Sequence, residues 1–409
     1  MVGVKYYILL LSLLSFQFLK AQSKSFYIHK DTIQLAENTG KLFVFEKLFN
    51  GLTIISKHAI NWKQIKLEIK TDSNGLQPFE CIADEHIETH QSNLVTFSAT
   101  NVFSIQAFEK MELILVFQYV APLGLHVPLN KKRDANCEQP KGIIPQSIWR
   151  MGLDSPKLGK TSSETHHCII HHSASGNGQS DYTFLVRSYY VQHTQVNGWD
   201  DIGYNYLIAS DGSIFAGRDP ETNQILQDEV TGAHFCGKNT NTMGVCLIGN
   251  FVSILPSNAM FSALQDLLVW KFAKDTLNPK GSFAHPFPLG NVLPSLATHR
   301  QGCPTTCPGD SVFNRLTQIR NNVYSQYQQC LKQTSVANVQ TNPIIIHPNP
   351  SHGLFNIKGL GFKKVEVFDV LGQKLLSSTE TSFFLPKGIH IAFVYNEKNV
   401  FKTIKLIVE

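Results

Sequence analysis

One short loop of the chain gathers residue types that bind metal ions. The stretch from Ala297 to Asp310 reads A-T-H-R-Q-G-C-P-T-T-C-P-G-D. His299 and Cys307 lie eight residues apart in it, too far for one helical turn and close enough for one folded loop. The two prolines of the stretch stiffen such a loop. Imidazole and thiolate are the usual ligands of zinc, so this loop could supply two ligands of a zinc site.

A third ligand could come from the stretch H-C-I-I-H-H, residues 167–172, which we expect to form a short apolar strand. Neighbouring side chains on a strand point to opposite faces, so at most one of His171 and His172 is expected to face a given metal. With His299 and Cys307, that histidine would complete a set of three ligands. Such a set leaves the fourth tetrahedral position of zinc open, which is the pattern of catalytic zinc sites.

Spacing alone leaves other interpretations open. Cys307 could instead form a disulfide with Cys303, four residues upstream. Further histidines are available as ligands: His166, His167, His234, His285 and His347.

Length and composition describe a globular protein of several domains. The chain has 409 residues, more than one compact core usually serves, so we expect two or three domains. Its hydrophobic content is 43% and its charged content 16%. The net charge of +5 is mild, and the sequence has no long Lys/Arg cluster, so a nucleic-acid partner is not expected.

The N-terminus has the pattern of a signal peptide, residues 1–21. Lys5 precedes an apolar run from Tyr6 to Leu19, and the small residue Ala21 follows. The run is shorter than the roughly 20 residues that a membrane-spanning helix needs. We therefore expect a protein that is secreted or displayed at the cell surface, without a stable membrane span after cleavage.

The eight cysteines all follow this segment. If one binds a metal, seven remain, so at most three disulfides form within the chain and at least one thiol stays free. Cys246 lies in the apolar stretch M-G-V-C-L-I-G, where cysteine acts as a small core residue, and we expect it to be free.

Apolar patterning divides the rest of the chain into three domains. Residues 25–130 contain short apolar runs with alternation at Ile65, Leu67 and Ile69, which predicts a β-rich, sandwich-like accessory domain. A polar linker, residues 131–142, follows. Residues 143–331 alternate strands with long helices, for example a helix from about Asn258 to Asp275, and predict an α/β domain. After a second linker, residues 332–342, residues 343–409 read as a small all-β unit.

Four stretches of residues 143–331 resemble the peptidoglycan recognition protein family, which has the fold of type 2 N-acetylmuramoyl-L-alanine amidases. They are I-I-H-H-S-A-S, G-W-D-D-I-G-Y-N-Y-L-I-A-S-D-G-S-I-F-A-G-R, G-A-H-F-C-G-K-N-T-N-T-M-G-V-C-L-I-G-N-F and T-H-R-Q-G-C-P-T-T-C-P-G-D, in the family's order. The resemblance implies an α/β fold, with a central mixed β-sheet flanked by helices, between an N-terminal all-β domain and a small C-terminal β-sandwich.

The resemblance also implies roles for single residues. His171, His299 and Cys307 would bind Zn²⁺, while His172 points away and packs. Tyr204 would lie beside the metal, and Thr305 matches a polar position that contacts the reacting group. Three residues are candidates for the walls of the substrate cleft: His193, Trp199 and His234. Where the family often has Gly and Asp, this chain has Thr298 and Gln301, and neither difference changes a ligand.

Cys236 and Cys303 are extra to the family's minimal motif. The resemblance brings both near the site, so a Cys236–Cys303 disulfide could brace the loop while Cys137–Cys330 ties the domain ends. The sequence does not decide the pairing.

The implied function is a secreted zinc-dependent N-acetylmuramoyl-L-alanine amidase. Zinc would lower the pKa of its water toward roughly 7, and the hydroxide would attack the amide between N-acetylmuramic acid and L-alanine in peptidoglycan. One alternative is a non-catalytic peptidoglycan-binding protein of the same fold, although such members commonly lack a ligand, typically the cysteine. Another is a structural surface adhesin with a vestigial site.

The tail resembles the C-terminal sorting domain of type IX secretion. It contains H-P-N-P-S-H-G, V-E-V-F-D-V-L-G-Q-K, L-P-K-G-I-H and a final K-T-I-K-L-I-V-E. This implies export across an outer membrane with the type IX machinery as a partner. The alternative is a small β accessory domain.

Overall fold

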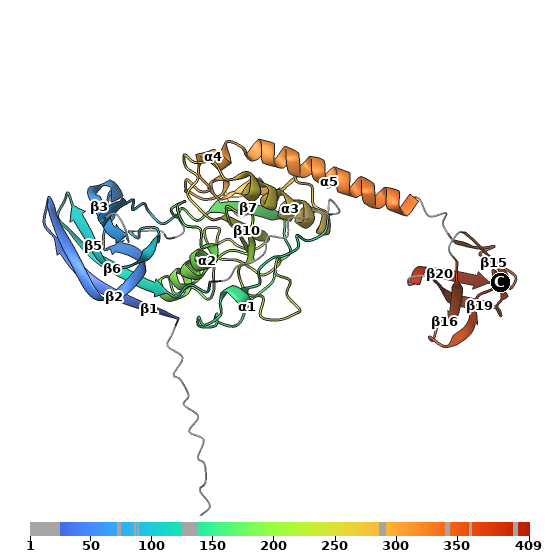
Figure 1. Cartoon of the computed structure of the whole chain (residues 1–409). Coiled ribbons are helices and arrows are strands. Elements are labelled where there is room, and N and C mark those ends of the chain that lie inside the picture. Colours follow the sequence, from blue (N-terminus) through green and yellow to red (C-terminus); the bar gives the residue numbers. More distant parts are fainter. Residues whose placement is uncertain are drawn as a thin grey trace, which may run out of the picture. The chain divides into compact units, whose positions relative to one another are not determined.

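The computed structural model describes residues 25–71, 75–85, 87, 90–124, 137–285, 292–339, 344–359, 362–395 and 400–409. The predicted signal peptide lies outside these residues. The chain divides into two compact units, one of Met1–Arg133 with Gln139–Tyr324 and one of Asp134–Glu138 with Ser325–Glu409 (Figure 1).

The first unit contains an N-terminal sheet and a central α/β domain. The N-terminal elements are β1 (Phe26–Leu35), β2 (Thr39–Ser56), a 3₁₀ helix (Trp62–Gln64), β3 (Ile65–Thr71), β4 (Gly75–Phe79), β5 (Val95–Ala107) and β6 (Met111–Val120). The central elements are α1 (Gln146–Trp149), β7 (His167–His172), α2 (Tyr182–Val191), a π-helical turn (Gln192–Val196), β8 (Tyr206–Ile208), β9 (Ile214–Ala216), β10 (Thr242–Leu247), α3 (Asn258–Lys274), β11 (Ser282–Ala284), β12 (Val292–Pro294), β13 (Leu296–Thr298), a 3₁₀ helix (His299–Gln301), α4 (Asp310–Phe313) and α5 (Leu316–Val339), which runs into the second unit.

The N-terminal strands form one six-stranded antiparallel sheet in the order β1-β6-β2-β5-β3-β4, where the sequence pattern predicted a sandwich-like domain. The long strand β2 shifts register against β5 between Val44 and Phe49 and again between Phe49 and Gly51. Such bulges bend a strand and increase its twist. One face of the sheet therefore encloses its own core, in which the Phe43 and Phe103 rings stack with centroids 4.6 Å apart.

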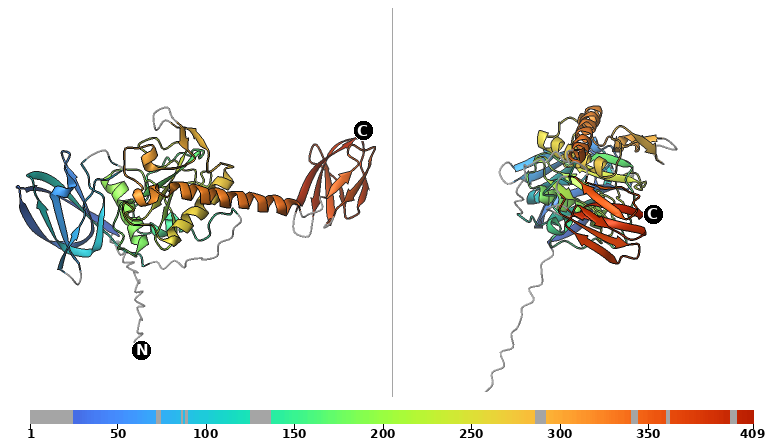
Figure 2. Two further views of the ribbon diagram at one scale, coloured as in Figure 1. Left: turned by 90° about the horizontal axis from the view of Figure 1, so that it is seen from above. Right: turned by 90° about the vertical axis from the view of Figure 1, so that its right-hand side faces the viewer.

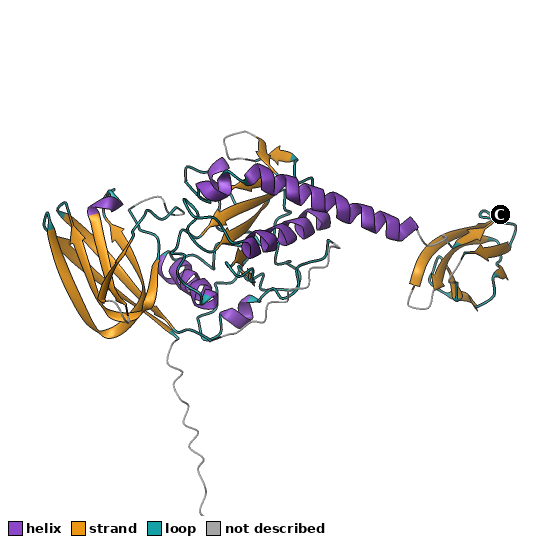
Figure 3. Ribbon diagram, turned by 45° about the horizontal axis from the view of Figure 1, so that its top comes forward, coloured by secondary structure: helices purple, strands orange, loops and turns teal. Residues whose placement is uncertain are grey.

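The central sheet is mixed, as predicted, with the order β13-β7-β10-β8-β9. β13, β7, β10 and β8 are parallel, and β9 pairs with β8 in the antiparallel direction. Helices cover both faces (Figure 3). Leu207 of β8 shares a core with α2, whereas the neighbouring Tyr206 contacts Trp270 of α3 edge to face, with ring centroids 6.5 Å apart.

Both helices begin at the capping residues that their sequences provide. The Asp181 side chain accepts the backbone N–H of Phe184 at the start of α2, and the Ser257 side chain accepts that of Met260 at the start of α3. The observed α3 ends one residue before the predicted boundary at Asp275.

The N-terminal sheet and the central domain share one hydrophobic core. The buried residues of α2 pack in one cluster with three residues of the N-terminal part: Phe26 of β1, Val120 of β6, and Leu94, which precedes β5. Figure 2 shows α2 on the side of the central domain that faces the N-terminal sheet. These two parts are therefore joined by apolar packing and not only by the chain.

The second unit contains a small all-β domain. Its strands are β14 (Ile345–His347), β15 (Leu354–Lys358), β16 (Lys364–Asp369), β17 (Lys374–Ser378), β18 (Ser382–Phe384), β19 (Gly388–Tyr395) and β20 (Val400–Val408). They form a three-stranded sheet, β14-β15-β18, and a four-stranded sheet, β17-β16-β19-β20, which share one apolar core. Within the residues described, no helix combines the length and apolar character needed to cross a membrane.

Arg187 of α2 is expected to be a major stabilising residue. Its fully buried guanidinium donates to the backbone carbonyls of Ala121, Trp149 and Met151, at 3.2, 2.7 and 2.8 Å. Arg187→Met would leave these three acceptors, one buried and two partly buried, without their donor. We expect the free energy of unfolding to fall by about 3 kcal/mol. Thermal unfolding should show a melting temperature several degrees lower. Arg315→Met, which removes one partly buried hydrogen bond, is the control and should change it little; equal effects would contradict the prediction.

Candidate metal centre

The pairing of two parallel strands brings the two predicted histidine ligands together. Thr298 of β13 pairs with Ile170 of β7, so the next residues, His299 and His171, follow side by side at the same edge of the sheet. The carboxyl ends of parallel strands are where α/β proteins build their sites. Cys307 returns to this edge in the loop after the 3₁₀ helix.

The three predicted ligands converge. The His171 and His299 ring centroids are 4.5 Å apart, and His171 Nδ1 lies 3.8 Å from Cys307 Sγ. One ligand atom from each residue lies within 4.8 Å of the others, and all three residues are buried. Ligand atoms around a tetrahedral zinc lie roughly 3–4 Å apart. Two imidazoles and one thiol at this spacing fit zinc in donor type and distance.

Three other clusters of metal-binding residue types contain residues that already form other bonds. Cys303, which with Cys236 and His299 forms one cluster, is in a disulfide with Cys236. In a second cluster, of Glu85, His172 and Cys307, the His172 Nδ1 accepts the backbone N–H of Phe251. A third cluster is acidic and forms ion pairs with Lys271 and Lys274: Asp228, Glu229 and Asp275.

A chain of hydrogen bonds fixes which nitrogen of His171 faces the site. The Thr242 hydroxyl donates to the Asn239 carbonyl at 2.7 Å, so its oxygen can accept from His234 Nε2, 3.3 Å away. His234 Nδ1 is then the acceptor for His171 Nε2–H at 2.9 Å. The remaining nitrogen of His171, Nδ1, keeps its lone pair and is the atom nearest Cys307. Such an ordered outer partner is typical of metal-binding histidines.

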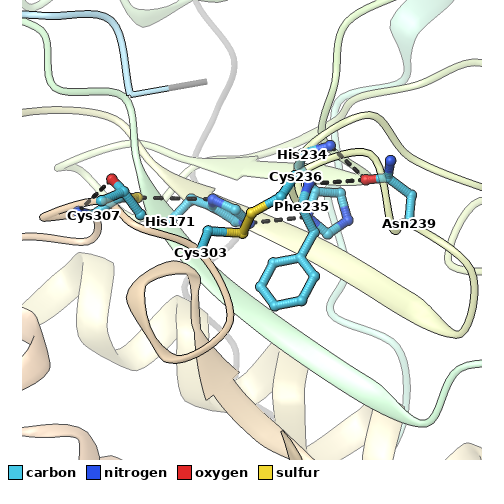
Figure 4. The surroundings of a disulfide bond; sticks show 8 residues. His171, His234, Phe235, Cys236, Asn239, Cys303 and Cys307 are labelled. Atoms are coloured by element: carbon cyan, nitrogen blue, oxygen red, sulfur yellow. Dashed lines mark hydrogen bonds between the residues drawn. A yellow bond between two sulfur atoms is a disulfide. The ribbon is translucent and has the colours of Figure 1, made fainter. Parts of the chain in front are cut away.

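The surroundings of His234 are shaped for this contact. Its backbone N–H donates to Asn239 Oδ1 at 2.7 Å (Figure 4). A Cβ at Gly244 of β10 would lie 2.5 Å from His234 Cδ2, so a side chain at that position would displace the ring. The sequence predicted His234 as a cleft-wall residue; it lines the groove and also holds His171.

Burial controls the protonation of Cys307. Desolvation raises the pKa of the Cys307 thiol well above its usual range, and the nearby Glu85 carboxylate raises it further. The backbone N–H of His172, 3.3 Å from Sγ, acts in the opposite direction. Without a cation the sulfur is therefore a thiol, and a metal bound to it would have to displace this proton.

Tyr204, which the family resemblance placed beside the metal, lies next to the predicted ligand His171. Its ring centroid is 5.4 Å from that of His171, and only 3% of the residue is exposed. Burial raises the pKa of the Tyr204 hydroxyl well above its usual range, so the group keeps its proton and can donate a hydrogen bond.

An open groove of about 1160 Å³ passes over this centre. His299 and three other predicted residues line it: Trp199, His234 and Thr305. Thr305 also shapes the loop, because its hydroxyl oxygen accepts the Cys307 backbone N–H at 3.1 Å. His193 lies elsewhere, in a small second cavity with Tyr204, and its ring packs on Trp199 with centroids 4.6 Å apart.

The N-terminal domain contributes one wall of the groove, which the sequence analysis missed. Residues of the segment after β4 line it: Glu80, Ile82, Ala83, Asp84, Glu85 and Ile87. Nothing in the local pattern of this segment marks it as part of a site. His172 is not part of the group formed by His171, His299 and Cys307, although one of its ring nitrogens lies within 4.8 Å of Cys307 Sγ. Its Nε2 bonds Glu85 Oε2 at 3.0 Å.

The two disulfides suggested by the family resemblance are present. Cys236 pairs with Cys303, which fixes the ligand loop beside His171 and His234 (Figure 4), and Cys137 pairs with Cys330. The alternative Cys303–Cys307 bond is thereby excluded. Four buried cysteines are free, and Cys246 is among them, as predicted: Cys81, Cys168, Cys246 and Cys307.

Comparison with known proteins agrees with the family resemblance of the central domain. Residues 161–310 match the Amidase_2 family model, described as N-acetylmuramoyl-L-alanine amidase, and all four sequence motifs lie in this stretch. The chain is 35% identical over 133 residues to a pig N-acetylmuramoyl-L-alanine amidase, a match that covers 32% of this chain and 19% of the relative. It is 27% identical over 181 residues to Drosophila simulans peptidoglycan-recognition protein SC2, covering 44% of this chain and 86% of the relative.

Among solved structures, wild-type Drosophila PGRP-LB matches with 28% identity over 43% of this chain and 92% of that chain, at a TM-score of 0.34. The family match, residues 161–310, lies in the central part of the chain. The resemblance of the tail to a sorting domain stays a prediction.

The cysteine arrangement predicts a distinct chemical pattern. In the native protein we expect the four free thiols to react slowly with an alkylating reagent, because all four are buried. Unfolding without reductant should make all four reactive. Peptide mapping by mass spectrometry should then recover Cys236 linked to Cys303 and Cys137 linked to Cys330. A peptide that links Cys303 to Cys307 would contradict this arrangement.

Proposed function

We propose that the protein is a zinc-dependent amidase that hydrolyses the bond between N-acetylmuramic acid and L-alanine in peptidoglycan. The observation that carries the proposal is the convergence of His171, His299 and Cys307 beneath an open groove, in a stretch that matches an amidase family. Tyr204 beside these ligands adds a hydrogen-bond donor suited to the reaction.

His171 would bind zinc through Nδ1, together with a nitrogen of His299 and the Cys307 sulfur. Two neutral imidazoles and one thiolate would leave the occupied site with a net charge of about +1. When bound, zinc supplies Lewis-acid chemistry: it acidifies a water molecule and polarises a carbonyl group. The hydrogen bond from His171 Nε2 to His234 would hold the ring proton on Nε2 and turn Nδ1 toward the metal.

The remaining groups would bind the substrate and stabilise charge. The protonated Tyr204 hydroxyl would donate to the amide oxygen as negative charge develops there. Thr305 accepts the Cys307 N–H and still has its own hydroxyl proton to donate into the groove. Trp199, backed by His193, offers an aromatic surface for a sugar or peptide group.

A non-catalytic peptidoglycan-binding protein is the second candidate, because several relatives are named as recognition proteins and a groove alone suffices for binding. The chain retains the cysteine ligand and Tyr204, and this favours the enzyme. For the whole protein we further propose secretion through the signal peptide, with the tail as a type IX sorting domain.

Cys307→Ala tests the ligand set. We expect the variant to lose zinc affinity by more than the roughly 10–100-fold that loss of an outer partner costs, and to release no stem peptides from peptidoglycan. Elemental mass spectrometry measures the bound zinc, and digestion of purified peptidoglycan measures the release of stem peptides. Cys81→Ala, another buried free thiol but in the N-terminal core, is the matched control and should keep both. Full zinc content and activity in Cys307→Ala would exclude it as a ligand.

Tyr204→Phe separates catalysis from binding. The variant should keep zinc and still sediment with peptidoglycan, while kcat falls about 10²–10³-fold because one donor to the developing oxyanion is lost. Tyr190→Phe is the control, since its buried hydroxyl donates to the Asp154 carbonyl and not into the site. If the wild type binds zinc and peptidoglycan but releases no stem peptides, the binding protein is the correct function.

A further inference from the structure

The groove wall formed by the N-terminal domain is held firmly in place. In the segment after β4, the Asp84 N–H donates to the Gln91 carbonyl at 2.9 Å, and the Asn93 N–H donates to the Ile82 carbonyl at 2.8 Å. These bonds tie the two sides of the segment to each other. Ser92 connects it to β2, because its N–H donates to the Ile54 carbonyl at 2.8 Å.

Polar contacts also dock this segment on the central domain. The Gln91 side chain donates to Asn197 Oδ1 at 3.1 Å, and the Asn93 side chain donates to the Ala174 carbonyl at 3.1 Å. Ala174 lies two residues beyond the end of β7. The segment is therefore fixed relative to the strand that carries His171.

Glu85 extends from this segment to both parts of the chain that carry ligands. One carboxylate oxygen bonds His172 Nε2 at 3.0 Å, and the other accepts the hydroxyl of Thr306. His172 follows the ligand His171 on β7, and Thr306 precedes the ligand Cys307. The side chain of Glu85 is 11% exposed and that of His172 is fully buried, so water screens the bond between them little, whereas the bond to Thr306 lies at the surface.

A second ring hydrogen bond turns His172 Nε2 toward Glu85. His172 Nδ1 accepts the Phe251 N–H at 3.2 Å, so the ring proton is on Nε2 and points at Glu85. The backbone N–H of the same residue donates to Cys307 Sγ at 3.3 Å. Fixing His172 therefore also fixes a donor to the ligand sulfur.

We propose that Glu85 is a positioning residue through which the N-terminal β domain holds the end of β7 and the Cys307 loop at the separation that zinc needs. The inference rests on the proposed zinc function. It gives the N-terminal domain a direct part in the metal centre in addition to forming a wall of the groove. Glu85 acts through His172 and Thr306, and the metal ligands remain His171, His299 and Cys307.

The test compares Glu85→Ala and Glu85→Gln in the full-length protein. Glu85→Ala removes both acceptors, and we expect the zinc dissociation constant, measured by competition with a chelator, to rise about 10–100-fold. Glu85→Gln keeps one carbonyl oxygen in place and should lose less. In the Co²⁺-substituted protein, Glu85→Ala should also change the visible absorption bands, which report the geometry of the thiolate and imidazole ligands.

Glu112→Ala is the matched control. Glu112 is also a carboxylate of the N-terminal domain, in β6, but it pairs with Lys57 at the surface and does not line the groove. It should leave zinc affinity and the cobalt spectrum unchanged. The melting temperature of each metal-free variant separates a general loss of stability from a change at the site. If Glu85→Ala does not fold, Glu85→Gln decides.

Three outcomes would overturn the inference. If both Glu85 variants keep the zinc affinity and the cobalt spectrum of the wild type, Glu85 does not position the site. Complete loss of zinc, equal to that of Cys307→Ala, would make Glu85 a ligand. A wild type that binds no zinc would refute the proposed function itself, and with it this role of Glu85.

Discussion

The centre depends on one constraint: His171 must present an unprotonated Nδ1 to the neighbouring sulfur. Imidazole has two nitrogens of nearly equal basicity, and burial alone does not choose between them. The carbonyl of Asn239 makes the choice, because it can only accept. The Thr242 hydroxyl donates to this carbonyl, so its oxygen accepts from His234 Nε2. His234 Nδ1 is then an acceptor, and His171 Nε2 must carry the proton. The loop residues 234–242 thus determine the chemistry of a strand residue that precedes them by more than sixty positions.

Burial of so many polar groups requires such connections. A buried polar group without a partner costs about 1–3 kcal/mol, and the centre contains imidazoles, a thiol and a phenol together. The structure meets this requirement with bonds to rigid backbone, such as the Phe251 N–H to His172 and the Cys307 N–H to Thr305. The Cys236–Cys303 disulfide limits the loop further. The three predicted ligands are therefore arranged without a metal, and such an arrangement would lower the free-energy cost of binding the proposed zinc.

The sequence predicted those parts of the molecule that local pattern encodes. The period of apolar residues identified α3, and the apolar run at residues 167–172 identified β7. Spacing made His299 and Cys307 candidates, but only the family resemblance selected His171 from the available histidines.

Long-range contacts were not predictable. No feature of the segment around Glu85 indicates that it meets a strand end 87 residues later. The register shifts that curl the N-terminal sheet likewise leave no clear mark in composition.

The relation between the two parts of the first unit follows from these contacts. A domain added only to bind a surface needs a linker and little else. Here Phe26 and Val120 lie in the core of the central domain, and Arg187 joins α2 to the end of β6 through the Ala121 carbonyl. Motion of the N-terminal sheet would have to break this core before it could move Glu85. The apolar interface therefore fixes the position of Glu85, whose single carboxylate contacts two neighbouring segments, with the precision that a metal centre demands.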